Sequence, residues 1–357
     1  MTSTILLRLP LLAITAGALV LGLDGGLARL GLAPAPMAAL DLHGAVMICG
    51  FFGTLIAVER AVADGRTPAF LVPALAALGA VLLIAGQERP AAAAFLSAGL
   101  GLTLLTGLAA FKLRTLFAAI MTAGAALWAW GCGLWIAGAF VMDVSYLWLG
   151  FLILTIVGER VELSRLISVG TGAKGLLVLL VALFVKALGR GEPWNGVGLL
   201  APSMAGMAFW LFVHDIALKT VTTSGLARYS AVCLLAGYAW LAAAAVSMAV
   251  APPGVAAFGH DAVVHAIGLG FVLSMVFAHA PIILPAVTGI AVRYLPALYA
   301  PAILLHTAVA LRIIGDLSER IALLSLSAWL TIASIILYVG TLVASAGRTV
   351  CRKHPIA

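Results

Sequence analysis

The sequence has little charge and little cysteine. Only 9% of its 357 residues are Asp, Glu, Lys or Arg, against about 25% in a typical soluble protein, and 64% are hydrophobic. This composition excludes an ordinary soluble domain. The four cysteines, at positions 49, 132, 233 and 351, show no CxxC spacing and no CxxCH motif. We therefore expect no disulfide framework, no cysteine-based zinc site and no covalently attached haem.

Long apolar runs take the place of the missing charge. A helix needs about 20 apolar residues to cross a bilayer, and on that basis the chain holds about twelve spans joined by short connections. They fall near residues 9–32, 40–63, 68–86, 91–111, 115–139, 145–168, 172–188, 196–220, 227–250, 261–285, 295–313 and 321–346. We expect an all-α integral membrane protein whose residues 1–357 form a single transmembrane domain, with membrane lipid as its surroundings.

The distribution of positive charge along the chain indicates a membrane topology rather than a nucleic-acid-binding site. The net charge is +7, and most of the 20 Lys and Arg residues fall in segments that twelve spans place on the side of the amino terminus. Cytoplasmic loops carry such an excess, so we expect both termini in the cytoplasm of a bacterial inner membrane and no nucleic-acid partner. The apolar run after Arg8 is longer than a signal peptide requires, which favours a first span.

A short motif recurs three times. The chain reads GFFGTLIAVERA from Gly50, GFLILTIVGERV from Gly150 and GFVLSMVFAHAP from Gly270. A polar residue stands about 13 Å further along each helix, at ~1.5 Å per residue: Glu59, Glu159 and His279. This spacing predicts a pseudo-threefold arrangement of four-helix repeats, near residues 1–111, 112–222 and 223–357.

The polar residues of the motif form an inner layer with three interpretations. Two carboxylates and an imidazole would suit a divalent transition metal such as copper, iron or zinc, so Glu59, Glu159 and His279 are candidate metal ligands. The same groups would suit a proton path. The arginine that follows each glutamate favours a structural ion-pair network instead. Pro281 and Pro285, which follow His279, would free backbone carbonyls where a helix lines a site.

Histidines form a second, outer layer. His43 lies in DLHGAVMICG and His265 in HDAVVHAIGLG, each close to glycines that would let a flat ligand approach the helix. Polar groups at membrane depth usually face a bundle interior and mark a functional site. The alternative for His43 is an interfacial histidine bonded to a loop carbonyl.

The spans and histidines resemble the catalytic subunit of the haem–copper oxidases and, more closely, the NnrS family of bacterial membrane proteins associated with nitric oxide metabolism. The resemblance rests on twelve spans in three groups of four, on histidines in the second and tenth spans, and on Val272-Leu273-Ser274-Met275. It implies a haem–copper oxidase subunit I-like fold and a haem b held by His43 and His265 as an axial pair. Spans six and seven hold no histidine, so no binuclear oxygen-reducing copper centre is expected.

Two further histidines are candidates near the same cofactor. His260 stands beside Asp261 at the start of its span, where it caps the helix or acts as a second ligand. His306 lies near the middle of a span. It would bond a haem propionate, serve as an alternative axial ligand, or bond a neighbouring helix.

The sequence thus predicts a haem-binding inner-membrane protein with a redox or gas-ligand role related to nitric oxide. Catalysis as a haem-dependent oxidoreductase is left open, and turnover would need a separate electron donor. The alternative is a membrane transporter or assembly factor for a metal ion or haem, with the two polar layers as stations along the membrane normal.

Overall fold

The computed structural model describes residues 3–34, 42–163, 169–196 and 198–350, and the side chains of those that lie between residues 8 and 346. All regular elements in these ranges are helices. Arg165, Arg352 and Lys353 are among the basic residues that predict the topology, and they lie outside the described part. Cys351 also lies outside it. The chain divides into two compact units, Met1–Leu200 and Ala201–Ala357.

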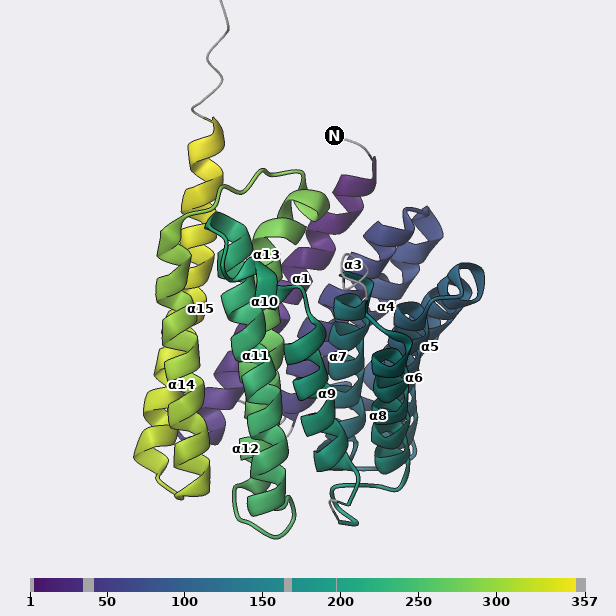
Figure 1. Ribbon diagram of the computed structural model, residues 1–357, viewed down its shortest axis with the longest axis vertical. Coiled ribbons are helices and arrows are strands. Elements are labelled where there is room, and N and C mark those ends of the chain that lie inside the picture. The colour runs from purple at the N-terminus through teal and green to yellow at the C-terminus, as the bar shows by residue number, and fades with distance from the viewer. Residues whose placement is uncertain (1–2, 35–41, 164–168, 197, 351–357) are drawn as a thin grey trace, which may run out of the picture. The chain divides into compact units, whose positions relative to one another are not determined.

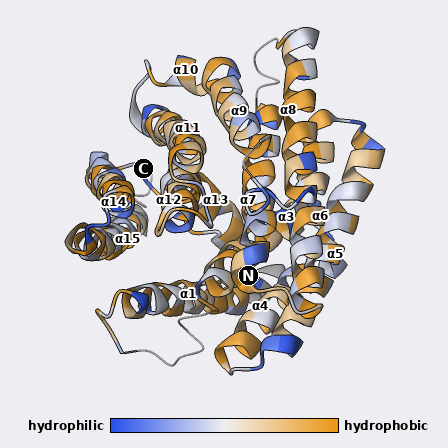
Figure 2. Cartoon of the chain, turned by 90° about the horizontal axis from the view of Figure 1, so that it is seen from below, coloured by the Kyte–Doolittle hydropathy of each residue, from blue (hydrophilic) through white to orange (hydrophobic). Residues whose placement is uncertain are grey.

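Eleven of the described helices are long and apolar enough to cross a membrane, which makes the chain a multi-pass helical membrane protein. Figure 2 shows hydrophobic residues along most of the length of these helices. The sequence predicts about twelve spans, and the difference arises at residues 196–220. Here the helix α9 covers only Leu200–His214. Its 15 residues span about 22 Å, which is less than the ~30 Å hydrocarbon core.

Asp215 explains why α9 stops early. Its Oδ1 accepts a hydrogen bond from the backbone N–H of Ala217 at 2.7 Å, which starts the short helix α10 (Ala217–Thr220). Its Oδ2 accepts a hydrogen bond from the Tyr238 hydroxyl at 2.9 Å. A carboxylate bonded to backbone and to a neighbouring helix ends the apolar helix at His214, so the span near 196–220 is shorter than expected.

The first unit contains seven of the membrane-length helices. In chain order its elements are α1 (Ser3–Arg29), η1 (Val46–Gly53), α3 (Thr54–Asp64), η2 (Thr67–Phe70), α4 (Leu71–Ile84), α5 (Glu88–Leu113), α6 (Leu116–Ile136), α7 (Val141–Leu163) and α8 (Thr171–Gly189). Small residues let these helices approach closely. A Cβ on Gly99 of α5 would lie 2.9 Å from the backbone of Ala129 on α6, and one on Gly124 of α6 would lie 3.1 Å from the Phe151 carbonyl on α7.

The second unit contains α11 (Gly225–Val250), α12 (Gly259–His265), η4 (Ala266–Val272), α13 (Leu273–Thr288), η5 (Pro296–Leu298), α14 (Tyr299–Leu317) and α15 (Ile321–Val350). Figure 1 shows α14 and α15 side by side, and the two helices pack along their length. Serine hydroxyls join α11 to α13 in both directions. Ser230 donates to the Ala278 carbonyl at 2.8 Å, and Ser274 donates to the Cys233 carbonyl at 2.7 Å.

Two long helices contain a wide-turned segment. Helix 42–64 holds the π-helical segment η1, and helix 259–288 holds the π-helical segment η4. The Gly-Phe pairs at Gly50 and Gly270 lie inside these segments, whereas the pair at Gly150 lies in the regular α-helix α7. Both helices end on a left-handed glycine, Gly65 or Gly289, where only a residue without Cβ adopts this conformation freely. The second copy of the motif therefore differs in backbone geometry from the first and the third.

Proline has a defined role in α13. Pro281 has no N–H, so the carbonyl of Phe277, four residues earlier, loses its helical partner. The hydroxyl of Tyr338 on α15 donates to this carbonyl at 2.8 Å, and the Tyr338 ring stacks on that of Phe277 at 3.8 Å. A carbonyl freed by proline thus fastens α15 to α13.

Candidate functional site

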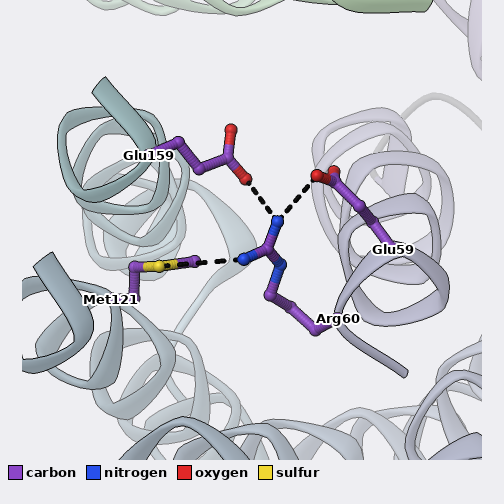
Figure 3. A network of polar contacts seen from close by, with 4 residues as sticks. All are labelled: Glu59, Arg60, Met121 and Glu159. Carbon is purple, nitrogen blue, oxygen red and sulfur yellow. Dashed lines mark hydrogen bonds and ion pairs between the residues drawn. The ribbon is translucent and has the colours of Figure 1, made fainter. Parts of the chain in front are cut away.

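Two glutamates and one arginine form an ion-pair network in the first unit (Figure 3). Nη2 of Arg60 lies 2.7 Å from Oε1 of Glu59 and 3.2 Å from Oε1 of Glu159. Its Nη1 lies 3.9 Å from the sulfur of Met121 on α6. The three charged side chains are between 17% and 25% exposed. One guanidinium nitrogen therefore bridges two carboxylates that are largely withdrawn from solvent.

The network joins two copies of the repeated motif. Glu59 and Arg60 come from α3, and Glu159 comes from α7, inside two membrane-length helices. Arg60 rather than Arg160 supplies the nitrogen that both glutamates contact, and Arg160 is only 3% exposed. Two carboxylates around one guanidinium leave one negative charge in excess among these three groups.

The donor set of this network suits an ion pair better than a metal ion. Within the described ranges, no three side chains of His, Cys, Asp or Glu are grouped so that they could hold a metal. Both glutamates face a guanidinium, so a divalent ion between them would set a second positive centre against Arg60. The third candidate ligand, His279, lies on α13 in the second unit. The structure thus joins Glu59 to Glu159 through Arg60, as the ion-pair interpretation expects.

His43 is held by the neighbouring helix α1. Its Nδ1 lies 2.7 Å from the Gly22 carbonyl, and because a carbonyl only accepts, Nδ1–H is the donor. Gly26, one turn further along α1, lies beneath the ring, since a Cβ there would come within 3.1 Å of Cε1. The carbonyl that Nδ1 of His43 contacts therefore belongs to a helix rather than to a loop.

His265 is held by its own helix. Its Nδ1–H donates to the backbone carbonyl of Asp261, four residues earlier, at 2.7 Å. In both His43 and His265 the Nδ1 proton is thus used by a carbonyl, which in the neutral ring leaves the lone pair on Nε2. This is the tautomer of a histidine that binds iron through Nε2. The donor chemistry of both residues fits an axial haem ligand.

The glycines near these histidines differ in their surroundings. A Cβ on Gly268, one turn after His265, would meet no heavy atom within 4 Å, so this side of η4 has open space. A Cβ on Gly270 would come within 2.6 Å of Trp240, so Gly270 serves the packing of η4 against α11. A Cβ on Gly44, beside His43, would make only an ordinary contact with Val141, at 3.7 Å. A methyl group is thus accommodated beside Gly268 but not beside Gly270.

The two remaining candidate histidines lie in the second unit. Trp240 donates its indole N–H to Nδ1 of His306 at 3.0 Å, which joins α11 to α14. In the neutral ring this places the proton of His306 on Nε2. Nε2 then has no lone pair for iron, and the lone pair of Nδ1 accepts the bond from Trp240. The bond to a neighbouring helix is the interpretation of His306 that this geometry fits. His260 lies in the first turn of α12 and is half-buried.

An ion pair within α14 joins two residues that the sequence motifs do not mark. Nε of Arg312 donates to Oδ2 of Asp316 at 3.0 Å, and the two residues are 8% and 2% exposed. The sequence LRIIGD could have indicated this pair, because its arginine and aspartate stand four residues apart in an apolar helix. At this spacing the two side chains share one face of the helix. The π-helical segments, by contrast, have no comparable signal in the residues.

The comparisons with known proteins yield a family but no activity. A family model described as "Domain of unknown function (DUF8744)" matches residues 8–347. No curated protein matches the chain. No solved structure matches it either.

Proposed function

Because the chain belongs to the family described as "Domain of unknown function (DUF8744)", which names no activity, we propose a function from the site residues themselves. We propose that the protein is a haem-binding membrane protein with a redox or gas-ligand role related to nitric oxide, as in the NnrS family that it resembles. The cofactor would be haem b, and His43 and His265 would be its axial ligands. Haem iron changes oxidation state and binds small gases, and the chain would supply the ligands and the apolar surroundings.

One shared arrangement carries the proposal. His43 and His265 each stand shortly before a π-helical segment, and each donates Nδ1–H to a backbone carbonyl at 2.7 Å. Such segments are rare and occur often at functional sites. A hydrogen bond on Nδ1 also orients the ring and makes Nε2 a better donor to a metal.

The same proposal includes the arrangement of the helices and the orientation of the chain in the membrane. The Gly-Phe pair common to the three copies supports a pseudo-threefold fold related to haem–copper oxidase subunit I. The distribution of Lys and Arg supports a bacterial inner membrane with both termini in the cytoplasm. A separate protein would deliver electrons if the haem turns over.

The optical spectrum of the detergent-purified protein tests the haem. We expect a Soret band that His43→Ala or His265→Ala abolishes, in protein from cells supplied with haem. His214→Ala is a matched control. His214 also directs Nδ1 to a carbonyl, that of Trp210 at 3.0 Å, but it ends a short α-helix, with its ring stacked on Trp210, and precedes no π-helical segment. A colourless wild-type preparation would contradict the proposal, and so would a band that only the control variant loses.

The second candidate is a transporter or assembly factor for haem or a metal ion. It is favoured by ion pairs inside membrane-length helices of both units, since charge at this depth often marks a transport path. Haem transfer separates the two candidates. A transporter should release its haem to an apo-acceptor protein within minutes, whereas a resident cofactor should stay bound at one equivalent per chain.

A further inference from the structure

Two buried cysteines of the first unit lie on helices that are far apart in the sequence. Cys49 belongs to the π-helical segment η1, and Cys132 belongs to α6. Both side chains are 0% exposed, and both thiols are free. Each cysteine lies inside a membrane-length helix. The pair is therefore in its reduced state and withdrawn from water.

Trp128 brings Cys49 against α6. Its Nε1–H donates to Sγ of Cys49 at 3.3 Å. The same indole lies against Gly53, about one turn after Cys49, where a Cβ would come within 2.8 Å of Cζ2 of Trp128. Cys132 follows Trp128 by four residues in a regular α-helix, so these two side chains share one face of α6. The face of α6 that contacts Cys49 thus also carries Cys132.

The two thiols also contact each other. A side-chain hydrogen bond joins Cys49 to Cys132, in addition to the bond that Cys49 accepts from Trp128. A thiol is both a weak donor and a weak acceptor, so either sulfur can donate. The remaining free cysteine of the described part, Cys233, belongs to α11 in the second unit. Cys49 and Cys132 therefore form a thiol pair within the first unit.

The surroundings of this pair favour a product without charge. Neither η1, nor α4 that packs on η1, nor α6 contains an Asp, Glu, Lys or Arg residue. Helices α5 and α7 pack on α6 and carry their charged residues near their ends. Copper(I) held by two thiolates would carry one negative charge, which is costly at membrane depth. A disulfide is uncharged and needs only the two sulfur atoms.

Trp128 also prepares one of the two sulfurs for reaction. The thiolate is the form of cysteine that attacks a disulfide, and an N–H donor stabilises a thiolate. The indole N–H is directed at Cys49. Cys49 also lies in a π-helical segment, a rare geometry that is frequent at functional sites. The attack is therefore assigned to Cys49, with Cys132 as the second sulfur.

We propose that Cys49 and Cys132 are a reversible dithiol–disulfide couple, which when oxidised joins helix 42–64 to α6 covalently. The oxidant is a small apolar disulfide, because such a molecule dissolves in the membrane and reaches thiols that water does not. Cys49 loses its proton and attacks one sulfur of this molecule, whose S–S bond breaks and whose first half leaves as a thiolate and takes up the proton.

A second exchange completes the reaction. Cys132 loses its proton and attacks the Cys49 sulfur of the mixed disulfide, and the second half of the oxidant leaves with that proton. Two protein thiols are thus oxidised to one disulfide, while the oxidant is reduced to two thiols. A dithiol reverses the reaction. The couple does not depend on haem binding.

Dithiodipyridine, a small apolar disulfide, tests the proposal on the full-length protein in detergent. The background variant Cys233→Ala/Cys351→Ser keeps only the proposed pair, and a protease site is inserted at residues 86–87, an exposed turn between the two cysteines. After reaction and cleavage, we expect the two fragments to run as one band without reductant and as two bands with it. The intact chain should lose two hydrogens in mass and keep no pyridyl adduct.

Two further variants sharpen the test. Cys132→Ser in the same background is the matched control, in which Cys49 should keep a pyridyl adduct and the fragments should separate without reductant. Trp128→Phe should slow the closure several-fold, because the Cys49 thiolate loses its N–H donor. An equal or faster rate in Trp128→Phe would overturn the assignment of the attack to Cys49.

Several results would overturn the proposal itself. These are a pyridyl adduct retained by the intact pair, fragments that separate without reductant, or thiols that react only after the protein is denatured. One equivalent of copper(I) that the pair retains without forming a disulfide, and that Cys49→Ser loses, would assign the pair to a metal instead. If the background variant does not fold, mass spectrometry of the oxidised wild-type chain must find the peptides of Cys49 and Cys132 linked.

Discussion

Helix 42–64 of the first unit and helix 259–288 of the second contain the same sequence of features, but their side chains form different contacts. Each has a histidine before a π-helical segment and ends on a left-handed glycine. His43 is held by the carbonyl of Gly22 on α1, whereas His265 is held by a carbonyl of its own helix. Beyond the π-helical segment, the first helix carries a charged network and the second a carbonyl freed by proline. The same sequence motif is thus compatible with two ways of joining helices.

The largest expected effect comes from removing the cation of the first helix. Arg60→Met removes the guanidinium that Glu59 and Glu159 share, and breaking this partly buried set should lower the free energy of unfolding by about 3 kcal/mol. Thermal or denaturant unfolding in detergent measures it. Arg66→Met is the control, since Arg66 forms a similar pair with Asp64 on an exposed turn and its loss should leave the unfolding midpoint unchanged. Equal midpoints for wild type and Arg60→Met would refute the structural role of the network.

The corresponding change in the second helix should be smaller and conditional. Tyr338→Phe keeps the stacked ring but leaves the Phe277 carbonyl without a donor, which should lower the free energy of unfolding by about 2 kcal/mol. In a Pro281→Ala background the new backbone N–H can donate to that carbonyl, so the same substitution should have less than half the effect. A double-mutant cycle measures this coupling. Purely additive effects would show that proline does not free the carbonyl for Tyr338.

A pair of glycine variants separates the two ways of holding histidine. Gly26→Ala places a methyl group against the His43 ring, whereas the methyl group of Gly268→Ala meets open space. Because alanine is more favourable than glycine in a helix by about 1 kcal/mol, neither variant should unfold the protein. We expect a several-fold loss of Soret absorbance per chain in Gly26→Ala and little change in Gly268→Ala. Equal absorbance in both variants would argue against His43 as a ligand.

The smallest expected effect concerns a metal ion. If Glu59, Glu159 and His279 bound a divalent ion, the double variant Glu59→Gln/His279→Ala would lose it. Since Arg60 already lies between the glutamates, we expect elemental analysis to find the same divalent metal content in this variant and in wild type. One equivalent of metal in wild type that the double variant lacks would restore the metal interpretation.

The helical class of the protein could be predicted because composition and the length of apolar runs determine it. The early end of α9 could not, since Asp215 acts through Tyr238, a residue of another helix. Glu59 and Glu159 could be placed on related helices by their spacing from a shared Gly-Phe pair. Which cation would bridge them depended on side-chain directions in three dimensions, and the two Glu-Arg pairs gave no means of choosing between Arg60 and Arg160.

A π-helical segment also changes the angular position of everything that follows it. Its turns contain more residues than those of an α-helix, so side chains beyond the segment are rotated about the axis relative to an unbroken helix. A helical wheel drawn through residues 42–64 would therefore assign Glu59 to the wrong face relative to His43, and one drawn through residues 259–288 would do the same for His279 relative to His265. In α7, which has no such segment, the wheel holds throughout. Copies of one motif that share a Gly-Phe pair and its spacing to a polar residue can thus present that residue in different directions.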